Sequence, residues 1–250
     1  MKTPFPSRRT TRAFTLIELS IVLVIIGLLV GGIASFNSYS RNARLSTLMN
    51  ESKILITAFG QFQDRYGAPP GDYSVASSAW TGAGNGDGNG LIRAGVVALP
   101  LERYYVFQHL ALAGFIQGTY TGAVNANGGA TIGLNVVGGA VDTSAFIFDH
   151  PDALDGVVSG DPLYFDGFYG NLLRVAGVIG TAATIPDQPF LTPKQAYQID
   201  DKFDDGLPAL GNVTSPKSTA LANCAASDLP TATYTTGNDT RTCYLFLRMP

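Results

Sequence analysis

One acidic side chain, Glu18, interrupts a long run of apolar residues near the start of the chain. Between residues 14 and 36 the other polar side chains are Thr15, Ser20 and Ser35. A carboxylate at the centre of a lipid bilayer costs about 2.5 to 3.5 kcal/mol, and less near the edge. If this run enters a membrane, Glu18 must therefore find a partner, reach the headgroups or keep a proton.

The run has the length and the flanks of a membrane-spanning helix. At about 1.5 Å per residue, residues 14–36 would rise about 35 Å, enough for a hydrocarbon core about 30 Å thick. Residues 1–13 contain Lys2, Arg8, Arg9 and Arg12 and no acidic side chain. The positive-inside rule predicts that these basic residues stay in the cytoplasm and that everything after residue 36 is carried across.

The sequence around Glu18 resembles a known processing site. Arg12-Ala13-Phe14-Thr15-Leu16-Ile17-Glu18-Leu19 is similar to the prepilin peptidase site of type IV pilins and type II secretion pseudopilins. The resemblance implies cleavage between Ala13 and Phe14, methylation of the new amino group of Phe14, and pairing of Glu18 with the N-terminus of a neighbouring subunit. Ala13 departs from the family, which usually has Gly there. Because alanine is also small, we expect cleavage to occur.

The same resemblance implies a function and a set of partners. It predicts a structural subunit of a type IV pilus or a type II secretion pseudopilus, and not an enzyme. The partners would be prepilin peptidase, other pilin or pseudopilin subunits and an assembly platform. The chain would stand in the bacterial inner membrane with its C-terminal domain in the periplasm until it enters a filament.

Two alternatives stay open. After removal of residues 1–13 the mature chain would have 237 of the 250 residues, which is large for a major subunit. A minor or tip subunit that contacts a secreted substrate or receptor is therefore the second hypothesis. The third is a secretory signal peptide, with Gly32-Ile33-Ala34 as the cleavage site. It would release a soluble periplasmic protein that begins at Ser35.

A glycine-rich hexapeptide is the first candidate metal site. Asn85-Gly86-Asp87-Gly88-Asn89-Gly90 has oxygen-bearing side chains at alternate positions and glycine at the sixth, as in the first half of a calcium-binding loop. The acidic residue expected at the twelfth position is absent, because that residue is Val96. We expect either an Asn/Gly turn or a weak Ca²⁺ site at Asn85, Asp87 and Asn89, which Asp72 or another remote oxygen would complete.

A second acidic group lies at the end of a predicted helix, at Asp200, Asp201, Asp204 and Asp205. The helix dipole disfavours acids there, so a solvated helix end and a bound cation are both open interpretations.

His109 and His150 are the only histidines and stand in unlike contexts. The sequence contains no recognisable Ser/His/Asp or Cys/His set, so it gives no sign of catalysis.

The two cysteines, Cys224 and Cys243, have no C-x-x-C spacing, which makes a zinc site improbable. An exported chain with two cysteines is expected to pair them in an oxidising compartment.

The charge distribution argues against another class of function. The formal net charge is −3, with eight basic and three acidic residues in 1–66 and eight basic and sixteen acidic residues in 67–250. An acidic body without a basic stripe argues against nucleic acid as a partner.

These residues must be positioned by a long helix and a mixed body. Apolar residues recur at three- and four-residue steps from residue 45 to residue 62, which predicts that the helix continues to about Tyr66 and ends at Gly67 with Pro69-Pro70. Beyond it we expect helices near residues 101–113 and after Thr192, and strands near 131–137, 145–148, 163–168 and 172–179.

The predicted fold class is therefore α+β, with an antiparallel sheet in a pilin-like globular domain. The expected organisation is a cytoplasmic leader (1–13), a transmembrane part of the N-terminal helix (14–36), a periplasmic amphipathic part (37–66) and the globular domain (67–250). The segments 108–114 and 204–206 also resemble those of a subgroup of larger pilin-like proteins.

Overall fold

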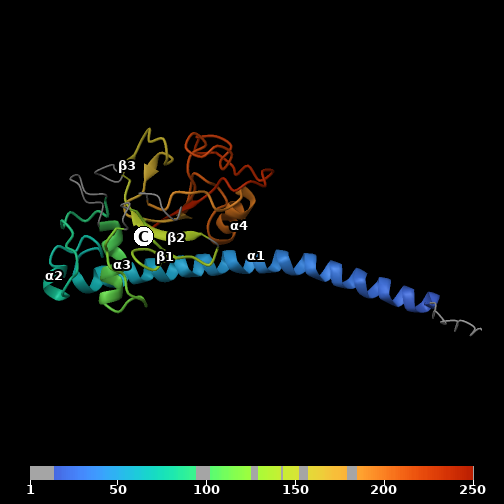
Figure 1. The fold of residues 1–250 in the computed structure, drawn as a ribbon. Coiled ribbons are helices and arrows are strands. Elements are labelled where there is room, and N and C mark those ends of the chain that lie inside the picture. The colour runs from blue at the N-terminus through green and yellow to red at the C-terminus, as the bar shows by residue number, and fades with distance from the viewer. Residues whose placement is uncertain are drawn as a thin grey trace, which may run out of the picture. The chain divides into compact units, whose positions relative to one another are not determined.

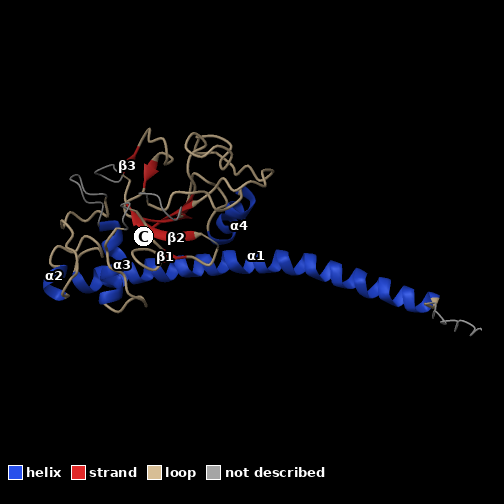
Figure 2. Cartoon of the chain, viewed as in Figure 1, coloured by secondary structure: helices blue, strands red, loops and turns tan. Residues whose placement is uncertain are grey.

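The computed structural model describes residues 14–93, 102–124, 129–141, 143–151, 157–178 and 185–249, with backbone alone at residues 32–38 and 157. The chain forms two compact units, Met1–Ala43 and Arg44–Pro250. Figure 1 colours the chain from its N-terminus to its C-terminus and labels the helices and some of the strands, and Figure 2 separates helices from strands.

Helix α1 (Leu16–Tyr66) begins in the first unit and ends in the second. Side chains from Phe14 to Gly31 are exposed. In the second unit the predicted apolar stripe is buried except for Ile56, which is partly buried; the buried members are Leu45, Leu48, Met49, Leu55, Phe59 and Phe62. The helix ends where predicted, because Gly67 adopts a positive φ of 71° and Pro69-Pro70 cannot continue it.

A five-stranded antiparallel sheet forms the centre of the second unit, in the order β1-β2-β5-β7-β6. A separate hairpin pairs β3 with β4. The strands are β1 (Val137–Gly138), β2 (Ser144–Asp149), β3 (Val157–Val158), β4 (Gly167–Phe168), β5 (Leu172–Gly177), β6 (Val213–Thr214) and β7 (Leu245–Arg248). The α+β class with an antiparallel sheet is confirmed.

The predicted strands are recovered in part. The runs 145–148 and 172–179 correspond to β2 and β5, which pair over six residues each. The run 131–137 is mostly turn and reaches a strand only at Val137, while 163–168 contains only β4 at its end. β7 was not predicted, although all but its last residue are buried.

Helices cover one face of the sheet. Phe148 of β2 stacks on Phe59 of α1, with ring centroids 4.8 Å apart, and lies 5.8 Å from Phe107 of α3 (Glu102–Leu112). The neighbouring residue Asp149 points to the opposite face, because side chains alternate along a strand. There its carboxylate forms an ion pair with the guanidinium group of Arg174 of β5, at 2.7 Å.

The other two helices are short. Helix α2 (Ala76–Ala79) is a single turn. Helix α4 (Pro193–Phe203) begins with the predicted capping box, in which the Thr192 hydroxyl accepts from the Gln195 backbone N–H at 3.3 Å and the Gln195 side chain accepts from the Thr192 N–H at 2.9 Å. Near its C-terminal end, Lys202 Nζ donates to Ser46 Oγ of α1 at 3.0 Å.

Candidate functional site

The first site is the start of α1, where Thr15 and Glu18 bind each other. Glu18 Oε2 accepts hydrogen bonds from the backbone N–H and from the hydroxyl of Thr15, both at 2.8 Å. In return the Thr15 hydroxyl accepts from the backbone N–H of Glu18 at 3.2 Å. This reciprocal arrangement is a capping box, which satisfies backbone donors that the first helical turn would otherwise leave unpaired.

The capping box lies on an exposed apolar segment. Phe14 is 83% exposed, Leu16 88% and Ile17 67%. Within the described part of the chain, Glu18 Oε1 accepts no hydrogen bond, so the carboxylate keeps one oxygen for a further donor. Ala13, on the other side of the predicted cleavage site, lies outside the described residues.

The predicted membrane span, 14–36, extends into residues whose side chains the structure does not describe, 32–36. Among the residues that are described, no helix is both long and apolar enough to cross a membrane.

The second site gathers three carboxylates from distant parts of the sequence: Asp72, Asp87 and Glu102. One oxygen of each lies within 4.8 Å of the others. Asp72 accepts from the backbone N–H groups of Gly88 at 2.6 Å and Gly90 at 2.7 Å. Glu102, at the start of α3, accepts from the backbone N–H of Asp87 at 3.0 Å. The loop that contains the predicted calcium-binding hexapeptide is thus folded around two buried acids.

The hexapeptide itself supplies only one member of this group. Asn85 is turned away, because its amide oxygen accepts from the Ser77 N–H at 2.8 Å. Asn89 donates from its amide nitrogen to Asp87 at 2.7 Å. The structure therefore places Asp87, rather than the predicted set Asn85, Asp87 and Asn89, with the other carboxylates.

Burial and mutual repulsion affect the titration of this carboxylate cluster. Burial raises the pKa of Asp72, and the carboxylate of Asp87 beside it raises the pKa further, while the N–H donors of Gly90 and Gly88 lower it. Burial likewise raises the pKa of Glu102. A cation bound between these groups would replace the repulsion by attraction.

The third site is the acidic end of α4. Asp200 is fully buried and accepts from the Tyr234 hydroxyl at 2.8 Å and from the Gly206 N–H at 3.0 Å. Burial raises the pKa of Asp200 to about 7. Asp204 accepts from the backbone N–H groups of Asn212 and Val213. These contacts fasten the helix end to the following loop, so two of the acids are structural rather than solvated.

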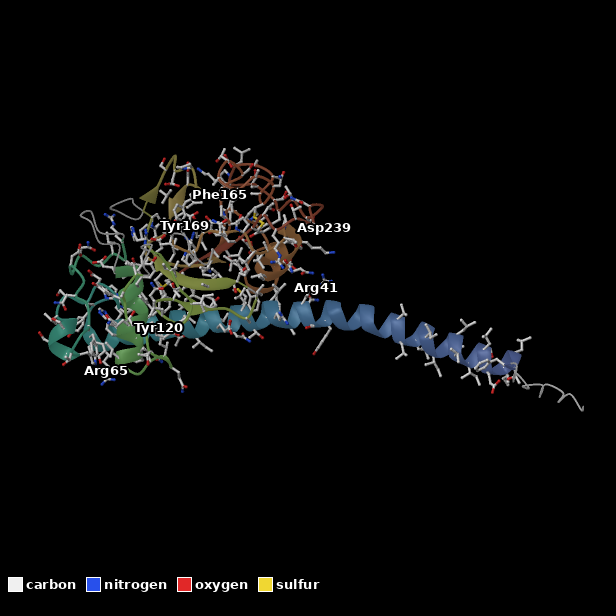
Figure 3. All side chains as sticks on the ribbon, viewed as in Figure 1. Arg41, Arg65, Tyr120, Phe165, Tyr169 and Asp239 are labelled. Carbon is white, nitrogen blue, oxygen red and sulfur yellow. A yellow bond between two sulfur atoms is a disulfide. The ribbon has the colours of Figure 1, made fainter. Side chains whose placement is uncertain are left out.

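Cys224 and Cys243 form the predicted disulfide (Figure 3). Both residues are completely buried. Cys243 also accepts, through its backbone carbonyl, from the N–H groups of Phe190 and Leu191 at 3.0 and 3.1 Å. The disulfide therefore joins the loop at Cys224 to the segment before β7, and backbone hydrogen bonds join that segment to the one that leads into α4.

Two of these arrangements were not predicted from the sequence, for different reasons. The Thr15-Leu16-Ile17-Glu18 spacing matches a capping box, so that signal was present next to the processing motif. The role of Glu102 could not be predicted from the residues next to it. Its carboxylate binds the backbone N–H groups of Asp87 and Arg93, which precede it by 15 and 9 residues in the sequence.

Comparison with known proteins bears on the N-terminal segment. No curated protein and no solved structure matches the chain. Residues 8–34 match the family model of the prokaryotic N-terminal methylation motif. This match includes Ala13, Phe14 and Glu18, the residues on which the resemblance was based. The chain therefore carries the N-terminal methylation motif that is the signature of type IV pilins and pseudopilins.

Proposed function

We propose that this chain is a structural subunit of a type II secretion pseudopilus or a type IV pilus, processed between Ala13 and Phe14 and assembled through the first part of α1. The observation that carries the proposal is an apolar helical segment, 14–31, whose side chains are exposed and whose one acid, Glu18, has only a local partner. The methylation motif covers the same segment.

Exposed apolar area explains why such a segment needs an environment other than water. Burying apolar surface contributes about 25 cal/mol per Å². The first unit leaves large side chains such as Leu16, Leu23 and Leu28 at 88%, 62% and 73% exposure. The inner membrane would cover this surface before assembly, and neighbouring subunits would cover it in the filament.

Glu18 supplies the specificity that apolar contact lacks. Its Oε1 would accept from the methylated amino group of Phe14 of a neighbouring subunit, as a charge-assisted hydrogen bond where water is scarce. Each such bond fixes the axial register between two helices. The capping box does not compete for that oxygen, because both Thr15 donors use Oε2.

The experiment compares Glu18→Ala and Glu18→Gln with wild type in sheared filaments and in membranes. We expect both variants to be cleaved and to accumulate in the membrane, but to be strongly depleted from filaments. Asp64→Ala is the matched control, since Asp64 is an exposed acid on α1 in the second unit. It should assemble normally. Normal incorporation of Glu18→Ala would contradict the proposed pairing.

Thr15→Ala separates the two roles of Glu18. It removes the hydroxyl half of the capping box and leaves the carboxylate in place. If pairing between subunits is the role of Glu18, Thr15→Ala should retain most of its assembly. A loss as complete as that of Glu18→Ala would show that capping within the chain is what matters.

The large second unit favours a minor or tip subunit as the second candidate. A mature chain of 237 of the 250 residues leaves a globular unit that begins at Arg44. A tip subunit would occur in one or a few copies per filament, whereas a major subunit would account for most of the filament mass. Quantitative mass spectrometry of sheared filaments distinguishes the two.

A bound Ca²⁺ ion is a further part of the proposal, and the structure changes the residues to test. Asp72, Asp87 and Glu102 offer oxygens within 4.8 Å of one another, whereas the side chains of Asn85 and Asn89 are engaged elsewhere. Oxygen ligands and negative charge are what Ca²⁺ requires.

A further inference from the structure

His109 is buried in α3 with both ring nitrogens bound to the segment that follows α1, residues 67–93. Its side chain is fully buried. Nδ1 accepts a hydrogen bond from the backbone N–H of Gly71 at 2.9 Å. Nε2 lies 2.8 Å from the carbonyl oxygen of Gly84. One side chain therefore holds the segment at two points thirteen residues apart.

The preceding residue, Gln108, binds the same segment. Its amide oxygen accepts from the N–H of Gly84 at 3.0 Å, and its amide nitrogen donates to the carbonyl of Gly82 at 3.2 Å. The same nitrogen donates to the carbonyl of Thr121 at 2.9 Å. Gln108 and His109 thus make four hydrogen bonds to the backbone of 67–93, all from one turn of α3.

The close approach of the segment to α3 depends on glycine. A Cβ at Gly71 would lie 2.6 Å from the carbonyl oxygen of Glu102 and 2.7 Å from Cγ2 of Val106, and the φ of Gly71 is +93°. A Cβ at Gly84 would lie 2.1 Å from the ring of Tyr105. Both contacts of His109 are therefore made at positions where the backbone itself reaches the helix.

The hydrogen bonds define which ring nitrogen carries the proton. The Gly71 N–H can only donate, so Nδ1 must be unprotonated. The proton then lies on Nε2, which donates to the carbonyl of Gly84. The imidazole is neutral, and aromatic rings surround it: the ring centroids of Tyr105, Phe62 and Trp80 lie at 6.0, 6.1 and 6.2 Å.

We propose that Gln108 and His109 form an acid-sensitive latch, which holds residues 67–93 against α3 and releases them when Nδ1 of His109 takes up a proton. A protonated Nδ1 would face the N–H of Gly71, so two donors would oppose each other at the present separation of 2.9 Å. Because Gly71 is buried, its N–H can regain an acceptor only if the segment moves. Its movement would uncover Phe62, which is now fully buried.

The direction of the pH effect distinguishes His109 from the charged groups around it. On the elements that contact His109, the charged residues nearest in sequence to its contacts are Asp64 and Arg65 on α1, Asp72, Asp87 and Arg93 in the segment, and Glu102 and Arg103 at the start of α3. Burial lowers the pKa of His109, so the folded state binds fewer protons than the unfolded state. The contribution of neutral His109 to the stability of the folded state is complete above about pH 6.5, and it is lost as the pH falls below that value.

For the buried carboxylates, the pH dependence of folding stability has the opposite sign. Burial raises the pKa of Asp72 and of Glu102, so both groups hold more protons in the folded state. Their contribution to stability therefore grows as the pH falls toward their ordinary range and diminishes as it rises. The shifts of Asp72 and Glu102 therefore oppose release of the segment by acid, whereas that of His109 favours it.

The chain contains its own reporter for this movement. Trp80 is the only tryptophan in the sequence, and it lies within the latched segment beside Tyr66, at a centroid distance of 5.3 Å. We would record its fluorescence in the full-length protein in detergent micelles from about pH 8 to about pH 4.5. The expected result is a red shift with a midpoint below about pH 6.5, as Trp80 leaves the aromatic cluster.

His109→Asn and His150→Asn form a matched pair of variants, since these are the only two histidines. Asn at position 109 offers an acceptor near the place of Nδ1 but does not titrate, so the shift should disappear. It should persist in His150→Asn. A shift that survives in His109→Asn, or a wild-type Trp80 signal that does not change with pH, would overturn the proposal.

Imidazole NMR of the wild-type protein gives a second measurement that needs no folded variant. The proposal predicts the Nε2–H form of His109 at neutral pH and a titration midpoint equal to that of the Trp80 shift. A His109 ring protonated on Nδ1 at neutral pH would refute it. A midpoint that differs from that of Trp80 would do the same.

Discussion

The two parts of α1 have the same backbone and opposite surroundings. In the first unit the residues from Phe14 to Gly31 are exposed, and the described polar contacts of Glu18 reach only three residues away. In the second unit the same helix buries Leu48 and Phe62 completely against a body to which distant segments contribute. An apolar helix that the chain itself leaves uncovered depends on partners, whereas one that the chain buries serves stability.

The largest effect is expected from Phe62→Ala. The Phe62 ring contacts those of Tyr66, Tyr73, Trp80, His109 and Phe115. Truncating a buried aromatic residue costs about 3 to 5 kcal/mol, because the cavity collapses only in part. Chemical unfolding of the full-length protein in detergent should show this loss. A change below about 1 kcal/mol would mean that the second part of α1 is not core.

Loss of the disulfide should be the next largest effect. Cys224 and Cys243 are separated by 19 residues, and the chain-entropy estimate for a loop of this size is about 3 kcal/mol. We expect the double variant Cys224→Ser/Cys243→Ser to unfold earlier in denaturant by about this amount. Labelling of the unfolded, unreduced wild type should find no free thiol, and two reactive thiols would refute the bridge.

A calcium titration would show whether a bound ion stabilises the second unit. If Asp72, Asp87 and Glu102 bind Ca²⁺, a free concentration one hundred times the Kd should stabilise the wild type by about 3 kcal/mol. Asp72→Asn should abolish the gain, while Asp228→Asn, a change at an acid outside the cluster, should leave it intact. Equal stability of the wild type with Ca²⁺ and with chelator would eliminate the site.

The smallest effect on stability, and the sharpest test of the comparison, is expected from Leu23→Ala. Leu23 is 62% exposed in the first part of α1, and exposed substitutions usually change stability by no more than about 0.5 kcal/mol. Its incorporation into filaments should nevertheless fall. A loss of folding stability like that of Phe62→Ala would show that this part of the helix is covered by the chain itself.

How much could be predicted from the sequence depended on the range of the interactions. The end of α1 at Tyr66, the capping box at Thr192 and the strands β2 and β5 are encoded by local patterns, and the structure confirms them. The Cys224–Cys243 pair was predictable because only two cysteines exist. The fold class followed from the same local patterns.

The carboxylate cluster was beyond local reasoning. The pattern of the hexapeptide 85–90 predicted its own asparagines as ligands. In the structure Asn85 binds Ser77 instead, and Glu102 of α3 lies beside Asp87. The interpretation of 131–137 as a strand failed similarly, since β-prone residues there form a turn closed by Thr131 and Asn135. Long-range packing decided the carboxylate cluster, whereas hydrogen bonds within 131–135 decided the turn.

The N-terminal residue of the mature protein tests the central claim most directly. Processing of the motif at residues 8–34 predicts a chain that begins with N-methylated Phe14, which intact-mass and terminal-peptide mass spectrometry of membrane and filament fractions would identify. A mature chain that begins at Ser35, or an uncleaved chain that retains Met1, would contradict a pilin-like subunit assembled through α1.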